Sequence, residues 1–142
     1  MALLAQDPTL ARLALDRMVA TGAHGRAMDL DKAAIRAGLA ALDGSTQEAI
    51  AGFRAAIAGW RDLGLPWDEA MTSLLFVRLV GTGSPEARAA ADAARAILEG
   101  LGARRAIEIL DGFVQASGQV AGDERPTTPA PTATDQVTTS SD

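Results

Sequence analysis

The chain has 142 residues, a net charge of −5 and no cysteine, so disulfides, thiolate catalysis and cysteine metal sites are excluded. The negative charge also argues against nucleic acid or an anionic membrane as a partner, since both require a basic surface. No apolar stretch reaches the length of about 20 residues that a membrane span needs. The N-terminal residues lack the cationic start of a signal peptide, so a cytoplasmic location is expected.

Two helices are expected before residue 45. Asp7 followed by Pro8 is typical of an N-cap with proline at the first helical position. This pair predicts a helix over residues 8–21. A second helix follows, and either Asp29 or Asp31 can cap its N-terminus.

The third and fourth helices are separated by a very short turn. Ser45 and Glu48 have the spacing of a capping box, in which each side chain accepts a hydrogen bond from the other residue's backbone N–H. They open a third helix, whose apolar face includes Phe53 and Trp60, both expected in the core. Gly64 ends this helix. The fourth helix follows at once and is apolar on nearly all sides, which predicts a buried position in the middle of the fold.

The fifth and sixth helices are expected over residues 85–101 and 104–115. Ser84 and Pro85 repeat the combination of N-cap and proline, and Gly102 ends the fifth helix. Small side chains at helical spacing on the fifth helix predict a close approach by a neighbouring helix. These small residues are Ala87, Ala91 and Ala94.

A helical motif occurs twice in this pattern, at residues 49–64 and again 38 residues later at 87–102, each copy ending in Leu-Gly. A repeat of this length indicates stacked helix pairs, because one pair alone cannot bury its apolar face. The predicted fold is all-α, with antiparallel helix pairs in a short, right-handed tetratricopeptide-like array of about six helices. This domain should span residues 1–118, and residues 119–142 should be a disordered Thr/Pro-rich tail.

Two pairs of stretches carry a resemblance to a known family. Ala-x3-Phe-x2-Ala at residues 49–56 and its counterpart at 87–94 resemble the second-helix signature of tetratricopeptide repeats. Residues 59–70 and 94–103 resemble the C-terminal repeats of large bacterial regulators. In those proteins an AAA-type or signal-transduction ATPase, with a nucleotide-cyclase or helix-turn-helix front domain, precedes a helical array. The resemblance covers residues 7–116 and implies a regulatory, non-catalytic repeat region.

The residues with catalytic potential are better explained structurally, so no catalytic, cofactor-binding or metal-binding residue is predicted. A phosphate-binding loop needs Gly-x4-Gly-Lys-Ser/Thr, whereas residues 81–84 lack the lysine and suit a turn between helices. His24 is the only histidine and has no metal-ligand pattern around it. Asp68 and Glu69 could form an acid/base pair, but in a first helical turn they complement the helix dipole.

The candidate partner-binding residues lie mainly in the first two helices, which hold more apolar surface than the third helix alone can cover. Leu10, Leu13, Arg17 and Arg36 are predicted to form this surface, because exposed apolar patches mark interfaces. Trp67, directly after a turn, is a further candidate for a surface contact.

The sequence therefore predicts a non-catalytic helical-repeat module for protein–protein interaction. The expected partner is a protein, a peptide or a second copy of the chain, with no cofactor, nucleic acid, membrane or small-molecule substrate. The alternatives are a structural homodimer or a truncated, non-functional piece of a regulator. A small helical enzyme ranks below both, because no convincing set of catalytic residues is present.

Overall fold

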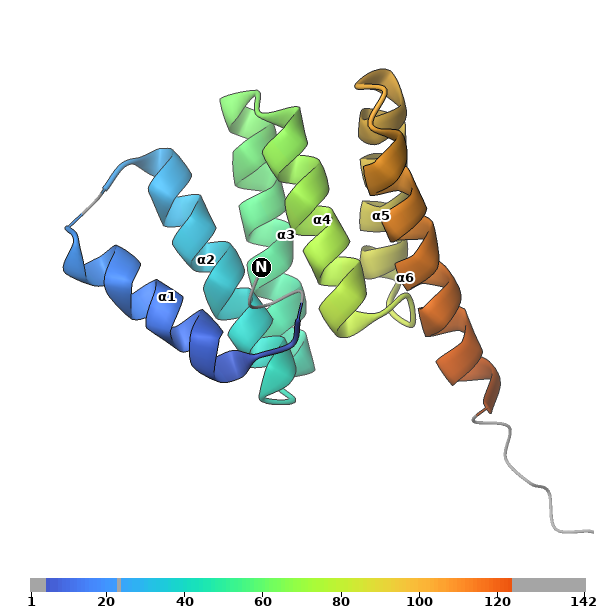
Figure 1. Ribbon diagram of the computed structural model, residues 1–142, viewed down its shortest axis with the longest axis horizontal. Helices are drawn as coiled ribbons and strands as arrows, with labels where there is room; N and C mark the ends of the chain where they lie inside the picture. Colours follow the sequence, from blue (N-terminus) through green and yellow to red (C-terminus); the bar gives the residue numbers. More distant parts are fainter. Residues whose placement is uncertain (1–4, 23, 124–142) are drawn as a thin grey trace, which may run out of the picture.

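The computed structural model describes residues 5–22 and 24–123, and within these ranges the chain is entirely helical, as predicted (Figure 1). Consecutive helices contact each other along the chain. The predicted disordered tail at residues 119–142 lies mostly outside the described residues. The helices are α1 (Pro8–Ala20), α2 (Arg26–Leu42), α3 (Thr46–Leu63), α4 (Pro66–Val80), α5 (Pro85–Gly100) and α6 (Arg104–Asp123).

The helices form two layers. Besides the contacts between consecutive helices, α4 contacts both α2 and α6, and α3 contacts α5. The helices α2, α4 and α6 therefore form one layer and α3 and α5 the other, with α1 lying at the N-terminal end against α2 (Figure 1). Because α4 contacts α2, α3, α5 and α6, its predicted central position is confirmed.

Local signals set three of the helix ends as predicted. The Asp7 carboxylate accepts a hydrogen bond from Leu10 N at 3.1 Å, and the Ser84 hydroxyl accepts one from Ala87 N at 3.1 Å. Gly64 ends α3 in the left-handed conformation, with φ of 68°, which glycine adopts without steric cost.

The predicted capping box at the start of α3 is wrong. Ser45 precedes α3, but its side chain makes no capping hydrogen bond. Its backbone N–H instead donates to Ala40 O at 2.8 Å, and the N–H of Gly44 donates to Ala41 O at 3.2 Å. These two bonds are the Schellman pattern that closes α2. Ser45 therefore belongs to the end of one helix as well as the start of the next.

Two other helix boundaries also differ from the prediction. α2 begins at Arg26, with Gly25 as its N-cap, so neither Asp29 nor Asp31 caps it. The intervening residues Arg, Ala and Met favour helix, which lets the helix start about one turn earlier. α6 continues to Asp123, beyond the predicted end near residue 115.

The main core lies between α3, α4 and their neighbours. Phe53 of α3 is fully buried and stacks on Phe76 of α4, with ring centroids 5.0 Å apart. Trp60 is also buried, as predicted. A second cluster joins α4, α5 and α6, and the predicted small residues of α5 are all buried: Ala87, Ala91 and Ala94.

A smaller cluster holds α1 in place. Ala11 of α1 and Leu39 of α2 form its buried centre. Leu15 and Leu42 pack around it, together with apolar side chains of α4. Within residues 5–22 and 24–123, none of the helices combines the length and hydropathy needed to cross a membrane.

Candidate functional site

The face of α1 that points away from α2 carries two exposed leucines. Leu10 is 52% exposed and Leu13 46% exposed, whereas Ala11 on the opposite side of the helix is 1% exposed. Arg17 is also exposed and lies seven residues after Leu10, which places it on the same face of a helix with 3.6 residues per turn. Three of the predicted partner-binding residues therefore share one accessible surface, called here the outer face of α1.

Arg36, the fourth predicted residue of this group, is exposed but lies on a different surface. It lines a shallow cleft of about 320 Å³ together with Arg12, Asp43 and Glu48. The Arg12 guanidinium bonds both carboxylate oxygens of Asp43, at 2.9 and 3.1 Å. Since Arg12 lies about 160° around α1 from Leu10, this cleft is separate from the outer face of α1.

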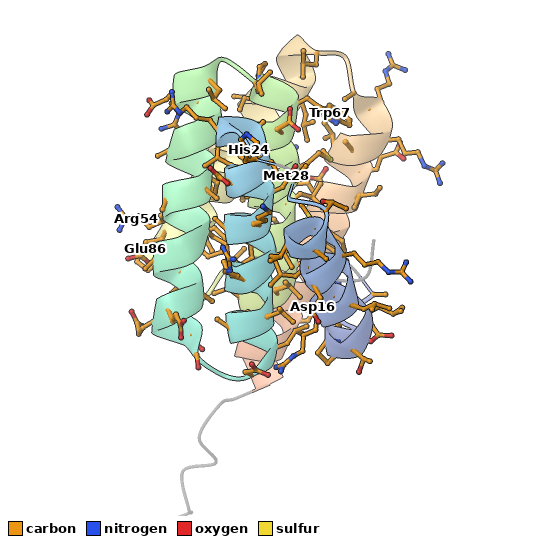
Figure 2. The ribbon with its side chains drawn as sticks, turned by 90° about the vertical axis from the view of Figure 1, so that its left-hand side faces the viewer. Asp16, His24, Met28, Arg54, Trp67 and Glu86 are labelled. Carbon is orange, nitrogen blue, oxygen red and sulfur yellow. The ribbon has the colours of Figure 1, made fainter. Side chains whose placement is uncertain are left out.

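Trp67 is 48% exposed at the start of α4, as expected for a surface contact residue. Leu65, in the turn just before it, is 38% exposed. Figure 2 places Trp67 well away from Asp16 of α1, so the indole does not extend the outer face of α1. Trp67 therefore belongs to a second accessible apolar surface at the turn between α3 and α4.

Carboxylates of α2 and α4 lie near one another close to Trp67. Loss of hydration, and secondly the negative charge of Asp68, raise the pKa of Asp31 above its usual value of 3.8. Asp68 lies in the first turn of α4, where its charge complements the helix dipole as predicted. The two carboxylates belong to different helices, so their proximity is a result of tertiary packing.

Glu69 has a structural partner that the sequence analysis did not identify. Its side chain is buried, and its Oε1 accepts hydrogen bonds from Arg61 Nη2 at 2.6 Å and from Arg61 Nε at 3.0 Å. This ion pair joins the last turn of α3 to the first turn of α4. Glu69 therefore fastens the turn and does not pair with Asp68 as an acid/base couple. The sequence does contain a signal for this pair: Arg61 and Glu69 have opposite charges and lie eight residues apart, on either side of the turn between α3 and α4.

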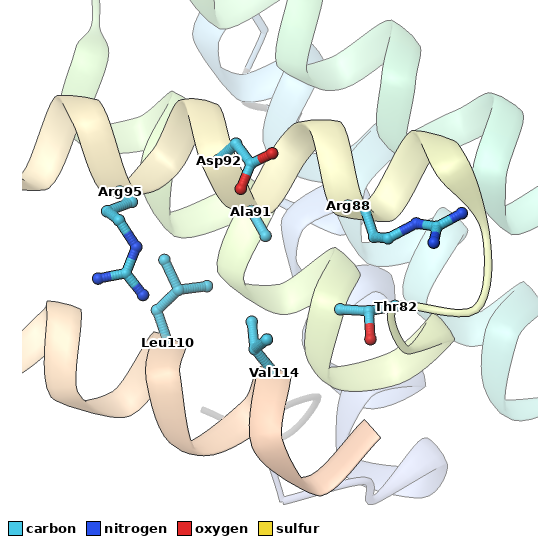
Figure 3. Close-up of a pocket in the computed structure, with 7 residues that line it drawn as sticks. All are labelled: Thr82, Arg88, Ala91, Asp92, Arg95, Leu110 and Val114. Carbon is cyan, nitrogen blue, oxygen red and sulfur yellow. The ribbon is translucent and has the colours of Figure 1, made fainter. Parts of the chain in front are cut away.

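The sequence analysis also did not predict a cleft that lies between α5 and α6 (Figure 3). It has a volume of about 250 Å³, with Ala91, Leu110 and Val114 as its apolar part. Arg95 forms an ion pair with Asp111 across the two helices, and its guanidinium points toward α6 beside Leu110. The other lining residues are Thr82, Arg88 and Asp92. The lining could accept a small apolar side chain, but it holds no nucleophile paired with a base.

The remaining candidates for chemistry lie in the connections between helices. His24 is exposed, with Nδ1 2.9 Å from Gly22 O. Gly81 and Ser84 end α4 and cap α5, so residues 81–84 form a turn between helices. In the part of the chain that the structure describes, no three His, Cys, Asp or Glu side chains come together in a group that could hold a metal ion.

Comparisons of the chain with protein-family models, with curated proteins and with solved structures found no match.

Proposed function

We propose that this chain is a non-catalytic helical-repeat module for protein–protein interaction, and that the outer face of α1 is its main partner-binding surface. The observation that carries the proposal is the exposure of Leu10 and Leu13 on one helix face. Single exposed leucines are common on protein surfaces, but two of them beside an exposed arginine form the kind of small patch that partners cover.

The physical reason is the free energy that contact with a partner would recover. Full burial of a leucine side chain is worth about 1.5–3 kcal/mol, so Leu10 and Leu13 together could contribute appreciably to binding. Arg17 would add a guanidinium able to pair with a carboxylate of the partner at the edge of the contact. Because α1 is already helical, little conformational freedom would be lost on binding.

Within the same proposal, the helices form a right-handed, tetratricopeptide-like array similar to the repeat regions of large bacterial ATPase regulators. In support, the two copies of the motif fall on α3 and α5, which form one layer. Arg36 and Trp67 would then act as additional contact points on separate surfaces, since both are exposed.

The test compares the native chain with the double variant Leu10→Ser/Leu13→Ser. Val19→Ser is the matched control, because Val19 is a 54% exposed apolar residue on another side of α1. A partner protein that the immobilised native chain captures should no longer be captured by the double variant and should still be captured by the control. Both variants should keep native helix content. If the double variant instead unfolds as a core variant does, the two leucines are interior in solution and the proposal is wrong.

The alternative is a structural homodimer formed through the same face. Light scattering over a wide range of concentration distinguishes the two possibilities. A dimer that the double variant converts to a monomer, with unchanged circular dichroism, would favour the homodimer. A native chain that remains monomeric would favour a different protein as partner.

A further inference from the structure

The attachment of α1 to the rest of the fold is weak. Ala11 is the only buried residue of α1, whereas α3 has six. Among the described helices, only the backbone of α2 comes close to that of α1. The ion pair between Arg12 and Asp43 is exposed, with 57% and 53% of the two side chains accessible. Exposed ion pairs of this kind contribute little to stability.

The link between α1 and α2 contains two glycines that have no packing neighbours. Gly22 and Gly25 both have positive φ, at 65° and 128°. A Cβ atom at either position would meet no heavy atom within 4 Å apart from those of its chain neighbours. The two glycines of this link therefore meet no side-chain packing that would fix the orientation of α1, and glycines tolerate the backbone changes that a hinge motion requires.

The surface beneath α1 is, in contrast, part of the main fold. Ile35, Leu39 and Leu42 of α2 and Leu75 and Leu79 of α4 pack around Ala11 in one apolar cluster. The apolar surface that these five side chains would present without α1 is called here the groove. Leu75 and Leu79 also pack against the main core cluster, which holds them in position independently of α1. The groove should therefore keep its shape when α1 leaves it.

The way α1 occupies this groove shows which helices fit it. Ala11, Leu15 and Met18 lie at positions i, i+4 and i+7, and all three are at least partly buried. Such spacing forms one apolar stripe along a helix. The small Ala11 lies at the buried centre of the contact, where a larger residue would keep the helix at a distance. Arg12, next to it, reaches the Asp43 carboxylate.

We propose that α1 is a displaceable cover, and that the groove between α2 and α4 binds an amphipathic helix of a partner protein. The partner helix should carry alanine or glycine at i, leucine at i+4 and a third apolar residue at i+7, with arginine at i+1 to pair with Asp43. This inference goes beyond the proposed function, because it concerns the side of α1 opposite to Leu10 and Leu13 and a different binding surface.

The experiment uses a fluorescently labelled peptide of residues 5–22 as the probe and measures its anisotropy with full-length chains. Ala11→Glu should release α1, because a carboxylate cannot enter the groove. If α1 covers the groove for about nine-tenths of the time, the apparent Kd of the native chain is about tenfold weaker than that of an uncovered groove. The Ala11→Glu chain should therefore bind the peptide about tenfold more tightly than the native chain.

Matched controls separate this effect from general damage. Ala14→Glu makes the same chemical change at an exposed position of α1, and that chain should bind the peptide as the native chain does. A peptide that itself carries Ala11→Glu should not bind any of the chains. Equal affinity of the native and Ala11→Glu chains, or the absence of saturable binding, would overturn the proposal.

A second measurement uses only the native chain, in case Ala11→Glu prevents folding. Excess unlabelled peptide should accelerate hydrogen exchange of the α1 amides without affecting those of α3. Unchanged exchange of α1 at saturating peptide would show that the groove does not take a second helix. A native dimer that the peptide dissolves would identify the occupant as α1 of another copy and would refute a separate partner. Neither result depends on Leu10 or Leu13, so this test and that of the proposed function can fail independently.

Discussion

Replacement of Phe53 by alanine tests the central packing of the fold. Phe53 is 0% exposed, and its ring stacks on that of Phe76 at a centroid distance of 5.0 Å and an interplanar angle of 18°. Phe53→Ala removes the whole ring from a site where neighbouring helices cannot fully collapse, so it should lower the free energy of unfolding by about 3–5 kcal/mol. For a domain of this size, each kcal/mol shifts the melting temperature by about 4 °C, which gives a decrease of about 12–20 °C.

Urea unfolding followed by far-ultraviolet circular dichroism measures this loss. Phe113→Ala is the control, because Phe113 of α6 is only partly buried. The centroid of its ring lies 5.3 Å from Cζ of Arg78 in α4. That variant should lose clearly less stability. A double-mutant cycle between Phe53 and Phe76 should give a coupling energy of about 0.5–1.5 kcal/mol. A loss below about 1 kcal/mol for Phe53→Ala would refute the assigned position of this ring in the core.

The other predictions concern ion pairing, helix capping, pH and packing. Glu69→Ala should cost about 1.5–3 kcal/mol in urea unfolding, because its buried carboxylate accepts two charged hydrogen bonds. Ser84→Ala should cost about 1 kcal/mol through the lost cap, whereas Ser45→Ala, without a side-chain cap, should change stability much less. Dehydration and a neighbouring carboxylate raise the pKa of Asp31 in the folded chain. At pH values above this raised pKa, the ionised Asp31 therefore lowers the stability of the fold. Below 3.8 the effect disappears, because the group is protonated in both the folded and the unfolded state. Asp31→Asn should accordingly raise the melting temperature at neutral pH and leave it unchanged in strong acid. Ala94→Phe should lower the free energy of unfolding by about 1–3 kcal/mol or more, because the larger side chain overpacks a site that is 0% exposed. A melting temperature equal to that of the native chain would contradict the close approach of neighbouring helices to Ala94.

Helix positions follow from the sequence where one local signal acts alone. Asp7 and Ser84 each cap a helix through a hydrogen bond to an amide three residues away, and Gly64 takes the backbone conformation that glycine allows. Ser45 has equally good capping chemistry, but the end of α2 already fixes its backbone. Ser45 could take part either in the Schellman motif that ends α2 or in a capping box that starts α3. The sequence pattern of each motif fits, so the sequence alone did not show which of them forms.

Burial was also predictable where a single helix has one clear apolar face. Phe53 and Trp60 share such a face and are both in the core. The small residues of α5 are buried as well, but the structure distinguishes among them: Ala94 is enclosed, while Ala91 borders the cleft between α5 and α6. This distinction depends on the rotation and tilt of α6, which the periodicity of α5 does not contain.

For the candidate surfaces, the sequence determined which side chains on one helix share a face, because the helical repeat fixes their angles. The prediction that Leu10, Leu13 and Arg17 lie on one surface agrees with their shared exposure on α1, although the same prediction also included Arg36. Only the tertiary structure decided that Arg36 faces a separate cleft and that the other side of α1 packs against apolar side chains of α2 and α4. Relations between helices depend on their separations and crossing angles, and these result from the packing of all six helices together, which no local spacing encodes.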